Sequence, residues 1–336
     1  MRIIVNTVVR NYRPVAVLLA VALAIVWFRP ASGTPEQRAA DLCIRAETAL
    51  KHGDDESAMT AFRESIAIHS PSVRARYGLA DLLAARGRFD EAKTTLVAIS
   101  PYVTNPREWM RYARALRNAR SDREAEAAYL RAVEAMPDNP AHALELAEFY
   151  LAAENLDNAE AQFRRARPFG GGHDRIFAGL GRVHFSRGEL DSAAACFRRA
   201  LEESPGEVDL LCDIAGTELR RRRPRPALSH VRRAVELDPH HPRARYVMGQ
   251  TLLALGHDEE AEAELAVFER QSRLAARIRY LERNAAENPT AQRYQTLSHY
   301  YMLSGRDSLA AACLQRATAL NPLVTAPTEA IGPDPF

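Results

Sequence analysis

The feature that most constrains this chain is a unit of about 34 residues that recurs along nearly all of it after the N-terminal segment. One copy, residues 174–207, contains two short amphipathic stretches, with Gly188 between them and Pro205 near the end. The apolar spacing predicts two α-helices, and glycine and proline are residues at which helices end. Such a pair of short helices cannot bury its apolar face alone, so it requires copies of itself on both sides.

Two positions of the unit identify the copies. If Asp174 is position 1, position 8 is always small, because two helix backbones approach each other there, whereas bulky residues at positions 4, 7 and 24 fill the space beside them. The residues at position 8 are Ala46, Ala80, Ala113, Ala147, Gly181, Ala215, Gly249 and Ser298. The residues at position 20 are Ala58, Ala92, Ala125, Ala159, Ala193, Ala227, Ala261 and Ala310. The interval between successive copies is constant except twice: the step from Ala80 to Ala113 is shorter by a single position, and the last step, from Gly249 to Ser298, is much longer.

This unit resembles the tetratricopeptide repeat, a helix–turn–helix of about 34 residues. The resemblance covers residues 39–322 and implies an all-α fold, a right-handed superhelical solenoid of about eight repeats. Leu274, Ile278 and Leu281 keep helical spacing, which predicts one long helix near 262–287 and accounts for the extra length of the last step. Residues 323–336 contain three prolines and are expected to form a flexible tail.

The N-terminal segment, residues 1–33, lies outside the repeat register. It has an unbroken apolar run at 15–28, flanked by Arg13 and Arg29. A run of this length is short for a membrane span of about 20 residues, although flanking arginines can extend its reach. The favoured interpretation is an uncleaved single-pass anchor, since Arg29 and Pro30 crowd the best cleavage site. The alternative is a cleaved signal peptide.

Basic residues before the apolar run place the N-terminus in the cytoplasm. The repeats are then expected on the other side of the membrane, in the periplasm of a Gram-negative cell. If the segment is cleaved as a signal peptide, the expected location is secreted or periplasmic.

The sequence contains no pattern that indicates catalysis or a metal site. It has no HExxH, GxSxG, GxGxxG or phosphate-binding loop, and its four cysteines form no CxxC pair. We therefore predict a protein that is not an enzyme and has no cofactor. Cys196 and Cys212 are expected on neighbouring helices, where a disulfide could form in an oxidising compartment, although buried free thiols are the favoured interpretation. The net charge of +2 argues against nucleic-acid binding.

Function must then come from the surface. In solenoids of the family that the chain resembles, the first helix of each repeat lines the concave face, and positions 2, 5, 9 and 12 project into the groove. The partner-binding residues that the resemblance implies at these positions are Arg74, Tyr77, Arg107, Arg114, Arg117, Arg175, Arg182, Arg243 and Tyr246; Arg111 is added because it matches a position of the carboxylate clamp described below. Because arginine dominates, the groove is expected to be basic and suited to an acidic or C-terminal peptide. The alternative is that these arginines only keep an alanine-rich helix soluble.

Chaperone-binding members of the family hold a terminal carboxylate with a clamp of basic and asparagine residues. Arg107 and Arg111 match the last two clamp positions, but Gly78 stands where an asparagine is expected. Chaperone binding is therefore not predicted. The densest run of charge, the arginines at 220–223 and 225, lies in a predicted turn and is either solvated or a contact for anionic lipid or acidic protein.

The predicted function is a membrane-anchored scaffold or assembly factor that binds peptides or other proteins through a basic groove. Two alternatives stay open. One is a structural subunit of an envelope biogenesis or secretion machine, and the other is an accessory module of an enzyme complex. The sequence does not indicate the partner or the oligomeric state.

Overall fold

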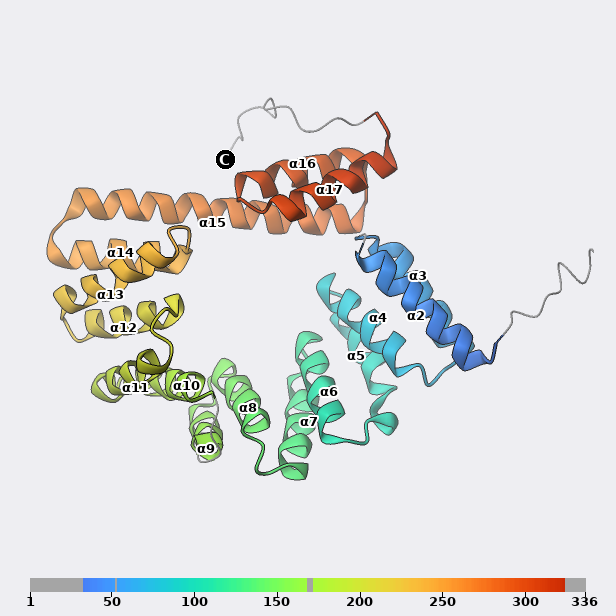
Figure 1. The fold of residues 1–336 in the computed structure, drawn as a ribbon, viewed down its shortest axis with the longest axis horizontal. Helices are drawn as coiled ribbons and strands as arrows, with labels where there is room; N and C mark the ends of the chain where they lie inside the picture. The colour runs from blue at the N-terminus through green and yellow to red at the C-terminus, as the bar shows by residue number, and fades with distance from the viewer. Residues whose placement is uncertain (1–32, 52, 168–171, 324–336) are drawn as a thin grey trace, which may run out of the picture.

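The computed structural model describes residues 33–51, 53–167 and 172–323, and within them the chain forms sixteen α-helices and no β-strand (Figure 1). The helices are α2 (Pro35–Lys51), α3 (Asp55–Ile68), α4 (Val73–Ala85), α5 (Phe89–Val97), α6 (Pro106–Asn118), α7 (Asp122–Ala135), α8 (Pro140–Ala152), α9 (Leu156–Ala166), α10 (His173–Ser186), α11 (Leu190–Glu203), α12 (Val208–Arg220), α13 (Pro224–Leu237), α14 (Pro242–Leu255), α15 (Asp258–Glu287), α16 (Ala291–Leu303) and α17 (Asp307–Leu320). They form eight consecutive helix pairs. The predicted all-α superhelical solenoid is thus confirmed.

The predicted anchor at residues 15–28 lies outside the described residues, as does the predicted tail after residue 323. Among the described helices, none is long and apolar enough to cross a membrane.

Every helix pair turns at position 15 of its repeat, where the backbone adopts a positive φ. Five of these residues are glycines, for which the left-handed conformation carries no steric cost. The glycines are Gly53, Gly87, Gly188, Gly256 and Gly305, and the other three turn residues are Arg120, Glu154 and Arg222. A left-handed non-glycine residue costs roughly 1–2 kcal/mol, so the packed helices on either side must hold these three turns in place. Glycine marks only five of the eight left-handed positions in the sequence.

The two small positions of the repeat lie where the paired helices meet. All eight residues at position 8 and all eight at position 20 are buried in the structure. At Gly181 there is no room for a side chain, since an added Cβ would lie 2.5 Å from the Phe197 ring of the same repeat. Close approach of the two backbones therefore explains the small residues, as the sequence predicts.

Glycine also appears at position 6 of two repeats, where the first helix packs on the preceding repeat. An added Cβ at Gly78 would lie 2.3 Å from Cζ of Phe62, and one at Gly179 would lie 2.1 Å from Cζ of Phe163. Both phenylalanines are fully buried. The absence of a side chain at these two glycines therefore leaves room for a phenylalanine ring of the preceding repeat.

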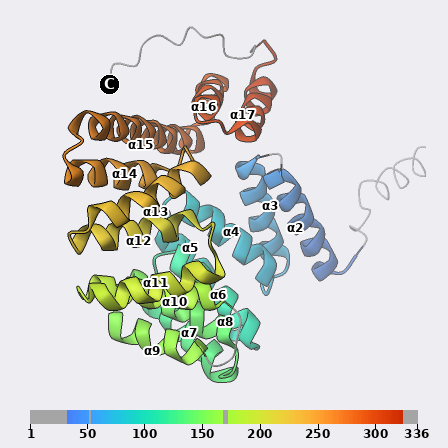
Figure 2. The same ribbon diagram turned by 60° about the vertical axis from the view of Figure 1, so that its left-hand side comes forward.

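The first helices of successive pairs form the inner wall of the solenoid. They contact one another directly, α4 with α6, α8 with α10, α10 with α12, and α12 with α14. Figures 1 and 2 show the pairs following one another around a curve that brings the last pair, α16–α17, back toward the first pair, α2–α3. The arrangement gives the molecule an enclosed inner surface.

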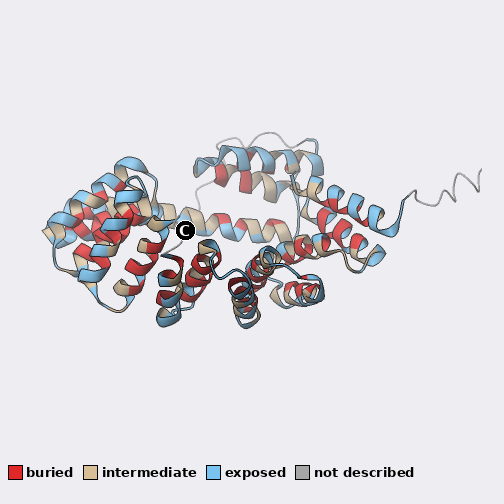
Figure 3. Ribbon diagram, turned by 60° about the horizontal axis from the view of Figure 1, so that its bottom comes forward, coloured by how far each residue is buried: buried red, intermediate tan, exposed pale blue. Residues whose placement is uncertain are grey.

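The helix α15 joins the last pair to the rest of the molecule. It has 30 residues, and no residue between Ala261 and Ile278 is buried (Figure 3). Its start packs in the core that α12, α13 and α14 share, whereas its end packs in a separate core with α16 and α17. The last helix pair is therefore carried at the end of a helix that is largely solvent-exposed in its middle.

The second helix of repeat two differs from the others in length. The helix α5 is the shortest of the described helices and is followed by a 3-10 helix, Ser100–Tyr102. Here the repeat is shorter than its neighbours by a single position. The solenoid continues without a break, since α6 still packs against both α4 and α5.

Candidate partner-binding groove

All ten residues predicted to bind a partner lie on first helices, on α4, α6, α10 and α14. Their surroundings differ from the expectation of a uniformly basic groove, because most of the arginines are already paired with carboxylates. The positions of these ion pairs therefore determine which arginine side chains on the first helices are left unpaired.

Two kinds of pair join neighbouring first helices. In the first kind, an arginine at position 2 pairs with a carboxylate at position 9 of the preceding repeat: Arg74 with Glu47 at 2.5 Å, and Arg175 with Glu148 at 2.8 Å. In the second kind, an arginine at position 9 pairs with a carboxylate at position 6 of the next repeat. The arginine of one such pair, Arg114, reaches Glu145 at 2.5 Å.

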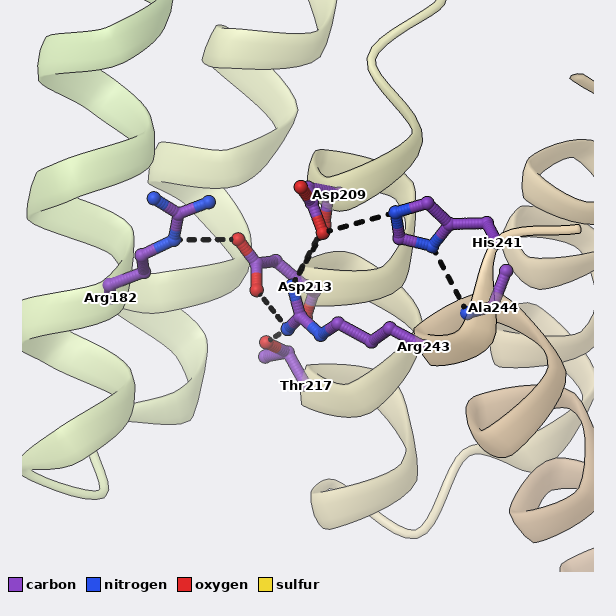
Figure 4. A network of polar contacts seen from close by, with 7 residues as sticks. All are labelled: Arg182, Asp209, Asp213, Thr217, His241, Arg243 and Ala244. Atoms are coloured by element: carbon purple, nitrogen blue, oxygen red, sulfur yellow. Dashed lines mark hydrogen bonds and ion pairs between the residues drawn. The ribbon is translucent and has the colours of Figure 1, made fainter. Parts of the chain in front are cut away.

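Arg182 makes the other pair of the second kind, with Asp213, at the centre of a polar network (Figure 4). The Asp213 side chain is only 6% exposed. It accepts a hydrogen bond of 2.9 Å from Nε of Arg182 and a second one from Nη2 of Arg243. Arg243 also lies 3.4 Å from Asp209, which is 3.8 Å from Nε2 of His241. The network ties α10, α12 and α14 together, so these predicted groove arginines have a structural role.

The predicted aromatic residues also have partners within the molecule. Tyr77 is 2% exposed and lies beneath the guanidinium of Arg111, 4.2 Å from the ring centroid. Burial raises the pKa of Tyr77 to about 12. Tyr246 is 39% exposed, stacks against Phe268 of α15 and accepts a hydrogen bond of 2.6 Å from Gln250. Tyr77 therefore supports Arg111, whereas Tyr246 is available at the surface.

The helix α6 exposes four arginines, which we call the α6 arginine row: Arg107, Arg111, Arg114 and Arg117. The first three follow i, i+4, i+7 spacing and so share one face of the helix, and Arg117 lies one turn beyond Arg114. Within the described residues only Arg114 of this row has an ion pair. Three guanidinium groups without an ion pair in that part of the chain therefore lie along a single helix, although the charge of Arg111 also acts on Asp81.

Arg107 lies at the same position of its repeat as Arg74 and Arg175 but forms no pair of the first kind in the described structure. In the pairs of the first kind, the interval from the carboxylate to its arginine is the same, from Glu47 to Arg74 and from Glu148 to Arg175. The interval from the corresponding carboxylate, Asp81, to Arg107 is shorter by a single position, and the two form no ion pair in the described structure. Asp81 interacts instead with Arg111 and Asn118, and burial raises its pKa.

Sequence reasoning missed the two carboxylates that form the second kind of pair. Glu145 and Asp213 occupy position 6, which the expected set of groove positions leaves out. The available signal was the repeat period itself, since an arginine at position 9 precedes an acid at position 6 of the next repeat in both cases.

The arginine run at 220–225 is partly structural. Arg220 stacks on Phe185 at 4.4 Å, and Arg221 pairs with Asp191 at 2.5 Å and with Glu218 at 2.7 Å. In the part of the chain that the structure describes, Arg222, Arg223 and Arg225 of this run are exposed and have no ion pair, and the same is true of Arg232 and Arg233 further along α13. All lie at the start or along the exposed side of α13.

All four cysteines are free thiols, Cys196 and Cys212 included. Burial raises the pKa of both thiols, for Cys212 to about 11. In the described ranges, no group of three or more His, Cys, Asp or Glu side chains is placed to hold a metal ion.

Two family models match the chain, and both are described as tetratricopeptide repeat. One matches residues 49–118 and 218–282, and the other matches 111–174 and 171–208. Together they cover about two thirds of the chain. No curated protein matches it by sequence.

One solved structure with a TM-score above 0.5 shows the same fold at low sequence identity. A crystal structure of a tetratricopeptide repeat protein from Parabacteroides merdae is 14% identical, with a TM-score of 0.56, and the match covers 84% of this chain and 99% of that one. YrrB, described as a TPR protein with an unusual peptide-binding site, is 20% identical with a TM-score of 0.39, covering 58% and 93%. At these identities the similarity concerns the fold alone.

Proposed function

Because the chain belongs to the tetratricopeptide repeat family, we propose that it is a scaffold that binds an acidic segment of another protein at the α6 arginine row. The observation that carries this proposal is the uneven distribution of charge on the inner wall. The predicted groove arginines on α4, α10 and α14 are paired with carboxylates, whereas Arg107, Arg111 and Arg117 have no ion pair within the described residues.

Unpaired arginines are the ones that can gain from a ligand. A guanidinium group that already has a carboxylate partner must give it up to bind another, whereas a free one forms a new charge-assisted hydrogen bond. The row lies on the inner wall, where an extended segment contacts several repeats at once. Asp and Glu side chains, or a terminal carboxylate, fit three guanidinium groups spaced along one helix.

Replacing Arg107, Arg111 and Arg117 together with glutamate is expected to weaken binding of an Asp- and Glu-rich peptide by at least about 100-fold. Each lost hydrogen bond to a charged group contributes roughly 1.5–3 kcal/mol, so reversal of three groups exceeds this threshold. Fluorescence anisotropy of the labelled peptide measures the effect, and capture of partners from the native membrane fraction tests it with the natural ligand.

The matched control reverses Arg225, Arg232 and Arg233, which are also exposed and lack an ion pair in the described structure but lie on α13, the second helix of its pair. The charge change is identical, so this variant should bind the peptide within about threefold of the unmodified protein. Equal losses in the two variants would show that net charge, rather than the inner wall, determines binding. Loss of the natural partner only in the α13 variant would assign binding to the outer face and favour the structural-subunit alternative.

We further propose that residues 1–33 anchor the scaffold in a membrane with the repeats on the periplasmic side. The support is the apolar run at 15–28 with its flanking arginines. Deleting residues 1–33 is expected to release the protein from the membrane fraction. Protease added to intact spheroplasts should digest the repeats, and complete protection that disappears on lysis would contradict the proposed orientation.

A further inference from the structure

The first and last helix pairs contact each other. Arg316 on α17 forms an ion pair with Asp55, the first residue of α3, at 3.5 Å. The guanidinium fits against the backbone of the α2–α3 turn, where a Cβ added to Gly53 would lie 2.5 Å from it. In a linear solenoid the two ends do not meet, so this contact closes the curve of helices into a ring.

The contact is not a packed core. Two cavities of about 490 and 390 Å³ lie between the two ends, lined by residues of both, among them Leu50, Tyr294 and Leu320. The ion pair itself is partly exposed, since the side chains of Arg316 and Asp55 are 23% and 37% exposed. An interface of this kind is held by a few side chains and is sensitive to salt.

Arg316 makes two contacts, a stacking contact with Tyr294 and the ion pair with Asp55, and comparison with other repeats distinguishes their roles. Position 26 also carries an arginine in repeats three to six, and in repeats three and five, where position 4 is aromatic, the arginine stacks on that residue. These pairs are Arg131 with Trp109 at 4.7 Å, Arg199 with Phe177 at 4.3 Å, and Arg316 with Tyr294 at 5.2 Å. Stacking is thus a feature of the repeat, whereas the ion pair to Asp55 is an additional contact that belongs to the last repeat.

The α15 helix supplies the means for the last pair to move. The pair has its own core, separate from that of α12–α14, and is joined to it through a helix of 30 residues, about 45 Å long at about 1.5 Å per residue. A small rotation at the start of such a helix displaces its far end by several ångströms. The end contact is therefore what fixes the position of α16 and α17 relative to α3.

We propose that Arg316 and Asp55 form a reversible latch, which holds the solenoid as a closed ring and releases α16–α17 to give an open form. The latch itself needs no ligand. Its consequence, that an open form admits larger partner segments to the inner wall, rests on the proposed function.

The test is a distance measurement between α3 and α17 in the complete protein without any ligand. Spin labels are attached at Glu64→Cys and Ser308→Cys, two exposed positions, in a Cys196→Ala background, because the other three native thiols are buried. Pulsed electron-spin resonance gives the distance distribution. At about 0.1 M salt a single short distance is expected, and at about 1 M, where the Debye length falls to about 3 Å, a longer population should appear.

Arg316→Glu is expected to shift the distribution to distances longer by about 10 Å or more, as the length of α15 allows. Adding Asp55→Arg to that variant restores an opposite-charge pair and should restore the short distance. The matched control is Arg199→Glu, which removes the same stacking contact in repeat five and should leave the distribution unchanged.

Three results would overturn the latch: an unchanged distance in Arg316→Glu, an equal shift in Arg199→Glu, or a failure of Asp55→Arg to restore the short distance. Because the measurement uses no partner, a failure of the proposed groove would leave its outcome unaffected.

Discussion

Gly179→Ala is expected to lower the free energy of unfolding by about 1–3 kcal/mol, although alanine forms helices better than glycine by roughly 1 kcal/mol. The added Cβ would lie 2.1 Å from Cζ of Phe163, and this ring is fully buried between repeats four and five. Neither helix can yield without losing contacts on its other side, so the overlap is relieved by separating the repeats. Urea unfolding followed by circular dichroism measures the change.

Gly216→Ala is the matched control, since Gly216 lies within α12 and an added Cβ there would meet no atom within 4 Å. This substitution should stabilise the protein by up to about 1 kcal/mol, because only helix propensity and chain entropy change. Phe163→Leu in the Gly179→Ala background should recover part of the loss, since the smaller side chain leaves room. Equal effects of the two glycine substitutions would show that the ring contact does not limit packing.

Asp213→Ala is expected to cost about 2 kcal/mol. Removing one partner of a fully buried ion pair costs roughly 3–5 kcal/mol. We expect a smaller loss of stability here, because Arg182 and Arg243 are 45% and 44% exposed and can be hydrated when Asp213 is removed. The loss should be confined to repeats five to seven, the ones that the network joins. Hydrogen exchange should therefore accelerate in α10, α12 and α14 before it does in α6.

Asp209→Ala provides the comparison for this variant. Asp209 belongs to the same network, but its side chain is 49% exposed and its contact with Arg243 is longer, at 3.4 Å. Its removal should cost less than about 1 kcal/mol. A similar loss in both variants would mean that the negative charge near Arg243, and not the buried position of Asp213, is what stabilises the three repeats.

The fold could be predicted from the sequence because the repeat makes each packing requirement visible eight times. Small residues at positions 8 and 20 mark the contact between the helices of a pair, and all of them are buried as expected. The left-handed residue could not be predicted in the three turns that lack glycine, although one of these turns, at Arg222, is itself predicted. Arg120, Glu154 and Arg222 adopt the left-handed conformation that glycine adopts in the other five, because the helices on both sides dictate the turn whichever residue fills it.

The charges of the groove could not be predicted, because each depends on two residues in different repeats. Position 14 shows this on another surface, where its arginine pairs with an acid at position 18 of the preceding repeat. The pairs are Arg86 with Glu56, Arg187 with Asp157, and Arg221 with Asp191. Where position 18 is itself an arginine, at 123 and 225, position 14 of the next repeat is Ala153 or Leu255. The number of arginines at one repeat position therefore does not show which of them are neutralised by an ion pair with the neighbouring repeat.

The short helix α5 has a consequence for how such a protein changes over generations. The deletion of one codon in a tandem array leaves the hydrophobic stack continuous, as the contacts of α6 with α4 and α5 show. The arginine at position 2 of the next repeat, Arg107, forms no ion pair with Asp81 in the described structure, whereas Arg74 and Arg175 at the same position are paired. A tandem array can therefore lose one residue between two helices and keep its packed core, while the charges on its surface vary independently of that core.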